Sequence, residues 1–224
     1  MVDLHTNGTN LFNNYEISQL AEGGLTKITF SIAHLDSDVN KKLMGVMQDT
    51  EMMIKTANTY GLLTRVSLVL TKSGISTFEE VVRFIREVGE MGAHMVVVRE
   101  LWIPNLVNPA NKEILKWCEE NFISVESIEK KFFNTTHEYH MGSVSELGQF
   151  ITKENSLGLI VGEPLPWGPP VYGMEGKFRD QNHGVNITFA RCDQNSKGPV
   201  LKSIVHRPNG HGYVNWDSNC FILY

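Results

Sequence analysis

Short apolar runs alternate with segments of helical periodicity over the first 125 residues of the chain. Each run has the length and the β-branched content of a buried strand, and the segment after it is long enough for a crossover helix. This alternation predicts a parallel sheet, because parallel strands need a long connection between them. The predicted strands are Val2–Leu4, Lys27–Ile32, Arg65–Leu70 and His94–Val98.

The clearest predicted helix covers Thr77–Met91. Thr77 and Glu80 have the spacing of a capping box, which predicts that the helix begins there. Two further helices are predicted, one over Val39–Tyr60 with a break near Gln48–Thr50 and one from about Asn111 to Phe122. The helix over Thr77–Met91 has an apolar face at intervals of three and four residues, formed by Phe78, Val81, Val82, Ile85 and Val88.

The pattern changes after about residue 125. A helix is predicted over Ser145–Lys153, and glycine and proline are then dense over 162–170, which excludes regular structure there. Val185–Ala190 and Val200–Val205 predict antiparallel strands, and Asn209-Gly210 is a typical hairpin turn.

We therefore expect an α/β fold in three parts. Residues 1–125 form a partial (β/α) barrel with parallel strands, residues 126–184 form a helix and a Gly/Pro-rich connection, and residues 185–224 form a small C-terminal antiparallel β-hairpin region.

Composition restricts the classes of function. The apolar fraction of 42% and the charged fraction of 20% are typical of a globular chain with a core. The net charge of −5, without any Lys/Arg cluster longer than a pair, argues against nucleic-acid binding. No run of 18 apolar residues and no signal peptide is found, so we expect no membrane partner. Cys118, Cys192 and Cys220 form neither a close pair nor an even set, which is typical of the reducing cytoplasm.

Polar residues follow all four predicted strands. The carboxyl ends of parallel strands lie at one edge of a sheet, so these groups are expected to gather at a shared mouth that could bind a ribose, an amino-acid moiety or a phosphate. The same residue types also favour turns and helix caps, and both interpretations stay open. The residues are His5–Asn10 after the first strand, Ser31, His34, Asp36 and Asp38 after the second, Thr71–Gly74 after the third, and Arg99 and Glu100 after the fourth.

Four of these segments, in this order, resemble strands of radical S-adenosylmethionine (SAM) enzymes. Asp3–Thr9 resembles the third strand of that family, which commonly ends in Thr-Asn-Gly, and Lys27–Asp36 resembles the fourth. Arg65–Gly74 is similar to the fifth strand, and Val96–Glu100 is similar to the sixth, which often ends in glutamate. His206–Val214 resembles the C-terminal hairpin of enzymes similar to the molybdenum-cofactor GTP cyclase.

The resemblance implies an enzyme that binds SAM and abstracts hydrogen from a small-molecule or peptide substrate through a 5′-deoxyadenosyl radical. It places Thr6 and Ser31 where strand-end hydroxyls contact SAM, with Asn7 beside them, and it places Glu100 and Lys72 on the substrate side. The chain departs from the family pattern at Ala33, Ser67 and Trp102.

Reductive cleavage of SAM needs an iron–sulfur cluster, which the family holds with a Cys-x3-Cys-x2-Cys loop. The chain has no such triplet, and no ligand spacing that would predict another metal site. By the resemblance, the cluster loop would precede Met1. We therefore expect the C-terminal part of a radical SAM enzyme, inactive alone and paired with a complementary N-terminal fragment or a homologue.

Two alternatives remain. One is a half-barrel without a cluster that serves as a binding or partner module. The other is an unrelated α/β barrel enzyme that uses Lys72, Glu100 and His34 at the same edge, because a fold alone never determines a reaction.

Overall fold

The computed structural model describes residues 2–9, 14–103, 112–136, 159–161, 171–174, 184–191, 205–206 and 212–213. The chain divides into two compact units, Met1–Cys192 and Asp193–Tyr224.

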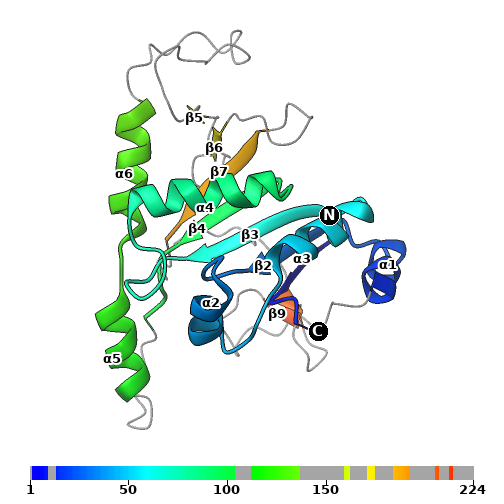
Figure 1. The fold of residues 1–224 in the computed structure, drawn as a ribbon, viewed down its shortest axis with the longest axis horizontal. Helices are drawn as coiled ribbons and strands as arrows, with labels where there is room; N and C mark the ends of the chain where they lie inside the picture. Colours follow the sequence, from blue (N-terminus) through cyan, green and yellow to red (C-terminus); the bar gives the residue numbers. More distant parts are fainter. Residues whose placement is uncertain are drawn as a thin grey trace. The chain divides into compact units, whose positions relative to one another are not determined.

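The larger unit contains a seven-stranded sheet in the order β1-β2-β3-β4-β7-β6-β5 (Figure 1). Its first five strands in this order are parallel, and β6 and β5 are antiparallel to their neighbours. The α/β class and the four predicted strands are thus confirmed. The strands are β1 (Asp3–Thr6), β2 (Lys27–Ser31), β3 (Leu63–Val69), β4 (Met95–Arg99), β5 (Leu159–Val161), β6 (Val171–Met174) and β7 (Val185–Ala190).

The helices begin and end largely where local signals predict. The capping box between Thr77 and Glu80 is present at the start of α4. The predicted helix over Val39–Tyr60 is divided in two, because Gly45 ends α2 with φ of 74° and Asp49 caps α3. The described helices are α1 (Asn14–Glu22), α2 (Ser37–Met44), α3 (Thr50–Thr59), α4 (Phe78–Glu90), α5 (Lys112–Asn121) and α6 (Val125–Thr136).

The order β1-β2-β3-β4 follows the sequence without reversal. Crossovers of one hand then place the connecting helices on the same face of the sheet. Figure 1 shows α3 and α4 crossing in front of the strands. This one-sided winding is typical of (β/α) barrels, whereas doubly wound sheets carry helices on both faces. The buried core between sheet and helices includes Phe30, Val66 and Val98 from the strands and Ile54, Phe84, Ile85 and Phe132 from the helices.

Residues 185–224 do not form the one separate antiparallel region that the sequence predicts. Val185–Ala190 is a strand of the main sheet, parallel to β4 on one side and antiparallel to β6 on the other. Its alternation predicts a strand with one buried face, but periodicity carries no information on the direction of the neighbours. In the smaller unit, β8 (Val205–His206) and β9 (Gly212–Tyr213) pair antiparallel over two residues each.

Four further predictions lie outside the described residues: the helix over Ser145–Lys153, the connection over 162–170, the strand over Val200–Val205 except its last residue, and the turn at Asn209-Gly210. Helix α6 (Val125–Thr136) was not predicted, because the only helix expected in the segment 126–184 was Ser145–Lys153. Within the described part of the chain, no helix is long and apolar enough to cross a membrane.

Candidate functional site

The sheet has two chemically different faces. Side chains alternate between the faces along each strand, and residues paired in a parallel register share a face. Phe30, Val66, Val96 and Ile187 are paired across four strands and are buried under the helices. The residues between these rows form the opposite face, which we call the polar face: Asp3, His5, Lys27, Thr29, Ser31, Arg65, Ser67, Arg99, Asn186 and Thr188, with Met95, Val97, Val69 and Ala190.

A charge cluster occupies one part of the polar face. The carboxylate of Asp3 lies 2.9 Å from Nζ of Lys27 and 2.7 Å from Nη2 of Arg65, and Nε2 of His5 is 3.3 Å away. The hydroxyl of Thr29 donates to Asp3 and accepts from Nε of Arg65, both at 2.9 Å. Burial alone would raise the pKa of Asp3, but the hydrogen bonds with His5 and Lys27 and the charge of Arg65 hold it well below its ordinary value.

The polar face carries more positive than negative charge. Lys27, Arg65 and Arg99 are cationic, and Asp3 is the carboxylate among its described residues. Burial lowers the pKa of the Arg65 guanidinium, Asp3 raises it, and the nearby charge of Arg99 lowers it further. Arg65 and Arg99 are therefore close enough to repel each other.

A buried amide network supports the carboxyl ends of β1 and β2. Gln48 is 7% exposed, and its Nε2 donates to the carbonyl oxygens of Asn7 and of Ser31, the latter at 3.1 Å. Its Oε1 accepts from the amide of Asn40, whose Oδ1 accepts from the backbone N–H of Ala33 at 2.9 Å. Buried amides with satisfied partners hold backbone segments in one arrangement, so Gln48 links the ends of two strands.

Thr6 and Ser31 are not brought together. Thr6 is paired with Phe30, so its side chain points toward the helix-covered face, whereas Ser31 follows Phe30 and points toward the polar face. The Oγ1 of Thr6 accepts from the backbone N–H of Gly8 at 3.0 Å, which closes the turn after β1. A shared mouth lined by both hydroxyls is therefore not formed.

Asn7 and Ser31 do lie together, because Gln48 binds the backbone of both. The side-chain Oδ1 of Asn7 accepts from the backbone N–H of Thr9 at 3.2 Å and from its hydroxyl at 2.8 Å. This is an Asx turn, the alternative that the sequence left open for such residues.

Glu100 lies beside the start of α6, and Lys72 lies beside the end of α5. Glu100 follows Arg99, and its Oε2 accepts from the backbone N–H of Val125 at 3.4 Å, at the first residue of α6. A carboxylate there stabilises the helix N-terminus. Lys72 is exposed, and its backbone N–H donates to the carbonyl oxygen of Asn121 at 3.1 Å, at the end of α5.

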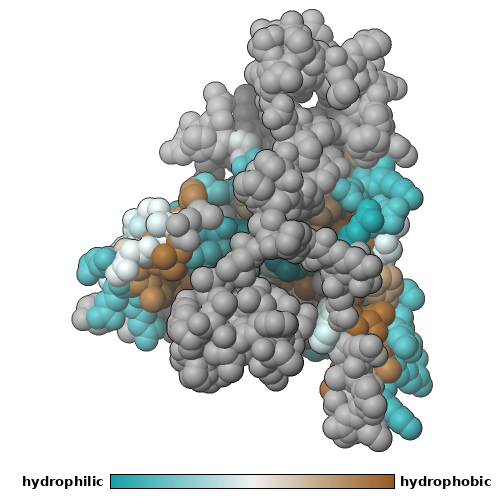
Figure 2. Space-filling model, turned by 180° about the vertical axis from the view of Figure 1, so that it is seen from behind, coloured by the Kyte–Doolittle hydropathy of each residue, from teal (hydrophilic) through white to brown (hydrophobic). Residues whose placement is uncertain are grey.

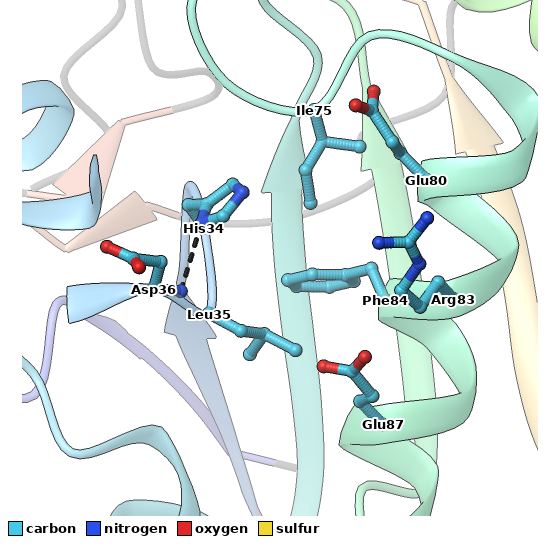
Figure 3. A pocket seen from close by; sticks show the side chains of 8 residues that line it. All are labelled: His34, Leu35, Asp36, Ile75, Glu80, Arg83, Phe84 and Glu87. Atoms are coloured by element: carbon cyan, nitrogen blue, oxygen red, sulfur yellow. Dashed lines mark hydrogen bonds between the residues drawn. The ribbon is translucent and has the colours of Figure 1, made fainter. Parts of the chain in front are cut away.

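His34 lies at a groove of about 280 Å³ between the β2–α2 loop and α4 (Figure 3). Its Nδ1 accepts from the backbone N–H of Asp36 at 2.9 Å, and Glu80 is engaged in the capping box of α4. The groove is lined by His34, Leu35, Asp36, Ile75, Glu80, Arg83, Phe84 and Glu87. The polar groups seen here are largely cap and turn residues.

The described residues do not fit an iron–sulfur cluster. They contain no group of three His, Cys, Asp or Glu side chains placed to hold a metal ion. Cys118, on α5, is 6% exposed, and Cys192 and Cys220 lie outside the described residues.

The polar face was missed by reasoning on strand ends. Its signal in the sequence is the alternation inside the strands: Asp3 and His5 in β1, Lys27 and Thr29 in β2, and Arg65 and Ser67 in β3. Polar residues at every second position mark a face without an apolar neighbour. Figure 2, which shows the molecule from behind the view of Figure 1, has hydrophilic and hydrophobic residues interspersed over its coloured surface. No protein-family model matches the chain, and no curated protein matches it.

Proposed function

We propose that the polar face is the ligand-binding surface of a radical SAM-type half-barrel and that it binds SAM beside Ser31 and the backbone of Asn7. One observation carries the proposal: a parallel sheet wound on one side presents polar and charged side chains on its other face. Parallel sheets covered on both faces have apolar strands on both. In (β/α) barrels the ligand lies at the carboxyl ends of the strands.

The chemistry of this face suits a polar ligand. Ser31 and Ser67 are paired across β2 and β3 near the carboxyl ends, and both present hydroxyl groups. Hydroxyl groups can hydrogen-bond the hydroxyls of a ribose, so the ribose of SAM has counterparts on this face.

The proposal gives this chain a binding role. Radical formation, which the resemblance implies, would depend on a cluster supplied by another segment or partner, in the reducing cytoplasm that the cysteine spacing favours.

Calorimetric titration of SAM into the full chain tests the proposal. Ser31→Ala and Ser67→Ala should each weaken binding about fivefold to tenfold, as expected for one lost hydrogen bond of about 1 kcal/mol. Ser127→Ala is the matched control, because this exposed hydroxyl lies on α6 and donates to the carbonyl oxygen of Ser124. Absence of SAM binding, or equal affinity in all three variants, would contradict the proposal.

Thr6→Val separates the polar face from the mouth expected at the strand ends. If SAM lies on the polar face, its affinity stays near the wild-type value, although the turn at Gly8 is weakened. If Thr6→Val lowers the affinity for SAM as much as Ser31→Ala does, then SAM also contacts Thr6 on the helix-covered face at the end of β1.

A further inference from the structure

Arg99 differs from Arg65 on the same face. The guanidinium of Arg65 is satisfied by Asp3 and Thr29. The Nε of Arg99 is buried and has no hydrogen-bond partner among the described residues. A buried donor of a charged group without a partner costs about 1–3 kcal/mol or more, and such groups in native proteins call for an explanation.

The register neighbours of Arg99 give it no counter-charge. Val69 and Ala190 are its register partners on the two neighbouring strands, and both are partly exposed. Ser67 and Thr188 come two residues earlier on those strands and so lie on the same face. The guanidinium therefore has uncharged neighbours in register and hydroxyl groups two positions earlier on the same face, and its planar fork of donors matches a carboxylate or a phosphate.

We propose that Arg99, with Ser67 and Thr188 on the same face of the sheet, is an anion subsite that receives the carboxylate or phosphate group of a substrate. This inference rests on the proposed function, since it takes the polar face to be the ligand-binding surface. It adds the class of substrate, a molecule that carries an anionic group other than the carboxylate of SAM. The positive excess of the face would draw such a substrate in, while Asp3 neutralises Arg65.

Nitrogen-15 labelling of arginine in the full chain tests the subsite. The Nε–Hε signal of Arg99 is identified by its loss in Arg99→Lys. Inorganic phosphate and acetate are titrated separately at constant ionic strength, with chloride as the reference anion. We expect the shift of the Arg99 signal to saturate with phosphate or with acetate. The anion that saturates the shift at the lower concentration indicates whether the substrate carries a phosphate or a carboxylate.

The variants give a second readout. Arg99→Gln should weaken binding of the preferred anion at least tenfold, and Arg99→Lys should weaken it less, since it keeps the charge and loses the planar fork. Arg83→Gln is the matched control, an exposed arginine on α4 under which anion affinity should not change. The inference is overturned if the Arg99 signal of the wild-type chain moves no more with phosphate or acetate than with chloride. This result does not depend on whether the variants fold.

The two proposals can fail separately. A chain that binds phosphate at Arg99 but does not bind SAM retains the subsite and refutes the SAM proposal. A chain that binds SAM through Ser31 while the Arg99 signal is unmoved by either anion retains the SAM site and refutes the subsite. If SAM itself saturates the Arg99 signal and abolishes the phosphate response, Arg99 binds the carboxylate of SAM, and the inference of a separate anionic substrate is refuted.

Discussion

Replacing Asp3 with asparagine tests whether the charge cluster stabilises the polar face. The carboxylate of Asp3, 20% exposed, contacts Lys27 and Arg65, whose side chains are 13% and 15% exposed. Removing one partner of a buried ion pair costs about 3–5 kcal/mol, and partial exposure lowers that figure through screening by water. We therefore expect Asp3→Asn to lower the free energy of unfolding by about 2–3 kcal/mol, or the Tm by about 4–10 °C.

Urea unfolding at pH 7, followed by circular dichroism, measures the change. Glu51→Gln is the control, because it removes an exposed pair with Lys55 on α3 that should contribute less than about 0.5 kcal/mol. The double variant Asp3→Asn/Arg65→Met should recover part of the loss, since it also removes a cation left without its counter-charge.

The effect should also depend on pH. The pKa of Asp3 is lowered from its ordinary value of 3.8 in the folded chain, so its ionised form stabilises the fold. That stabilisation is fully present above the unfolded pKa and is lost as the pH falls below it through the folded pKa. The difference between wild type and Asp3→Asn should therefore shrink from pH 5 toward pH 2. A variant as stable as wild type at pH 7, or a difference that does not shrink in acid, would refute this account of the cluster.

Three other substitutions test local features, each by urea unfolding. Gln48→Ala removes a buried amide that binds the ends of β1 and β2, and should cost about 2–3 kcal/mol; a loss below 0.5 kcal/mol would show that the network is dispensable. Gly8→Ala should cost about 1–3 kcal/mol, because φ is +77° and the added Cβ would lie 2.5 Å from Cε of Met53; Met53→Ala in the same chain should relieve the steric part. Glu80→Ala removes the carboxylate of the α4 capping box and should cost about 1 kcal/mol, whereas the same loss in the exposed neighbour Glu79→Ala would point to helix propensity instead.

Local patterns were sufficient to predict the elements that build the parallel sheet. The four N-terminal strands and α4 are found within two residues of their expected bounds. Strand alternation, helical periodicity and a capping box involve residues close in sequence, so their energetics are readable without the rest of the fold. The division between α2 and α3 had a comparable local cause in Gly45 and Asp49.

The candidate site was only partly predictable. Ser31 and Asn7 lie together, but Thr6 and Glu100 point toward the helix side. A position at the end of a strand predicts that a residue lies near the edge of the sheet, but it does not predict the face. A shift of one residue along the strand places the side chain on the opposite face. The register between β1 and β2, set by long-range pairing, determined that outcome.

The sequence by itself determined the four N-terminal strands, the helices from α2 to α5 and the parallel direction of those strands, because these depend on short-range periodicity and connection length. Only the tertiary structure decided that Val185–Ala190 joins the main sheet beside β4, and that Asp3, Lys27 and Arg65 meet on one face. These contacts join residues that are far apart in the chain, and their formation depends on how the strands pair and which face the helices cover.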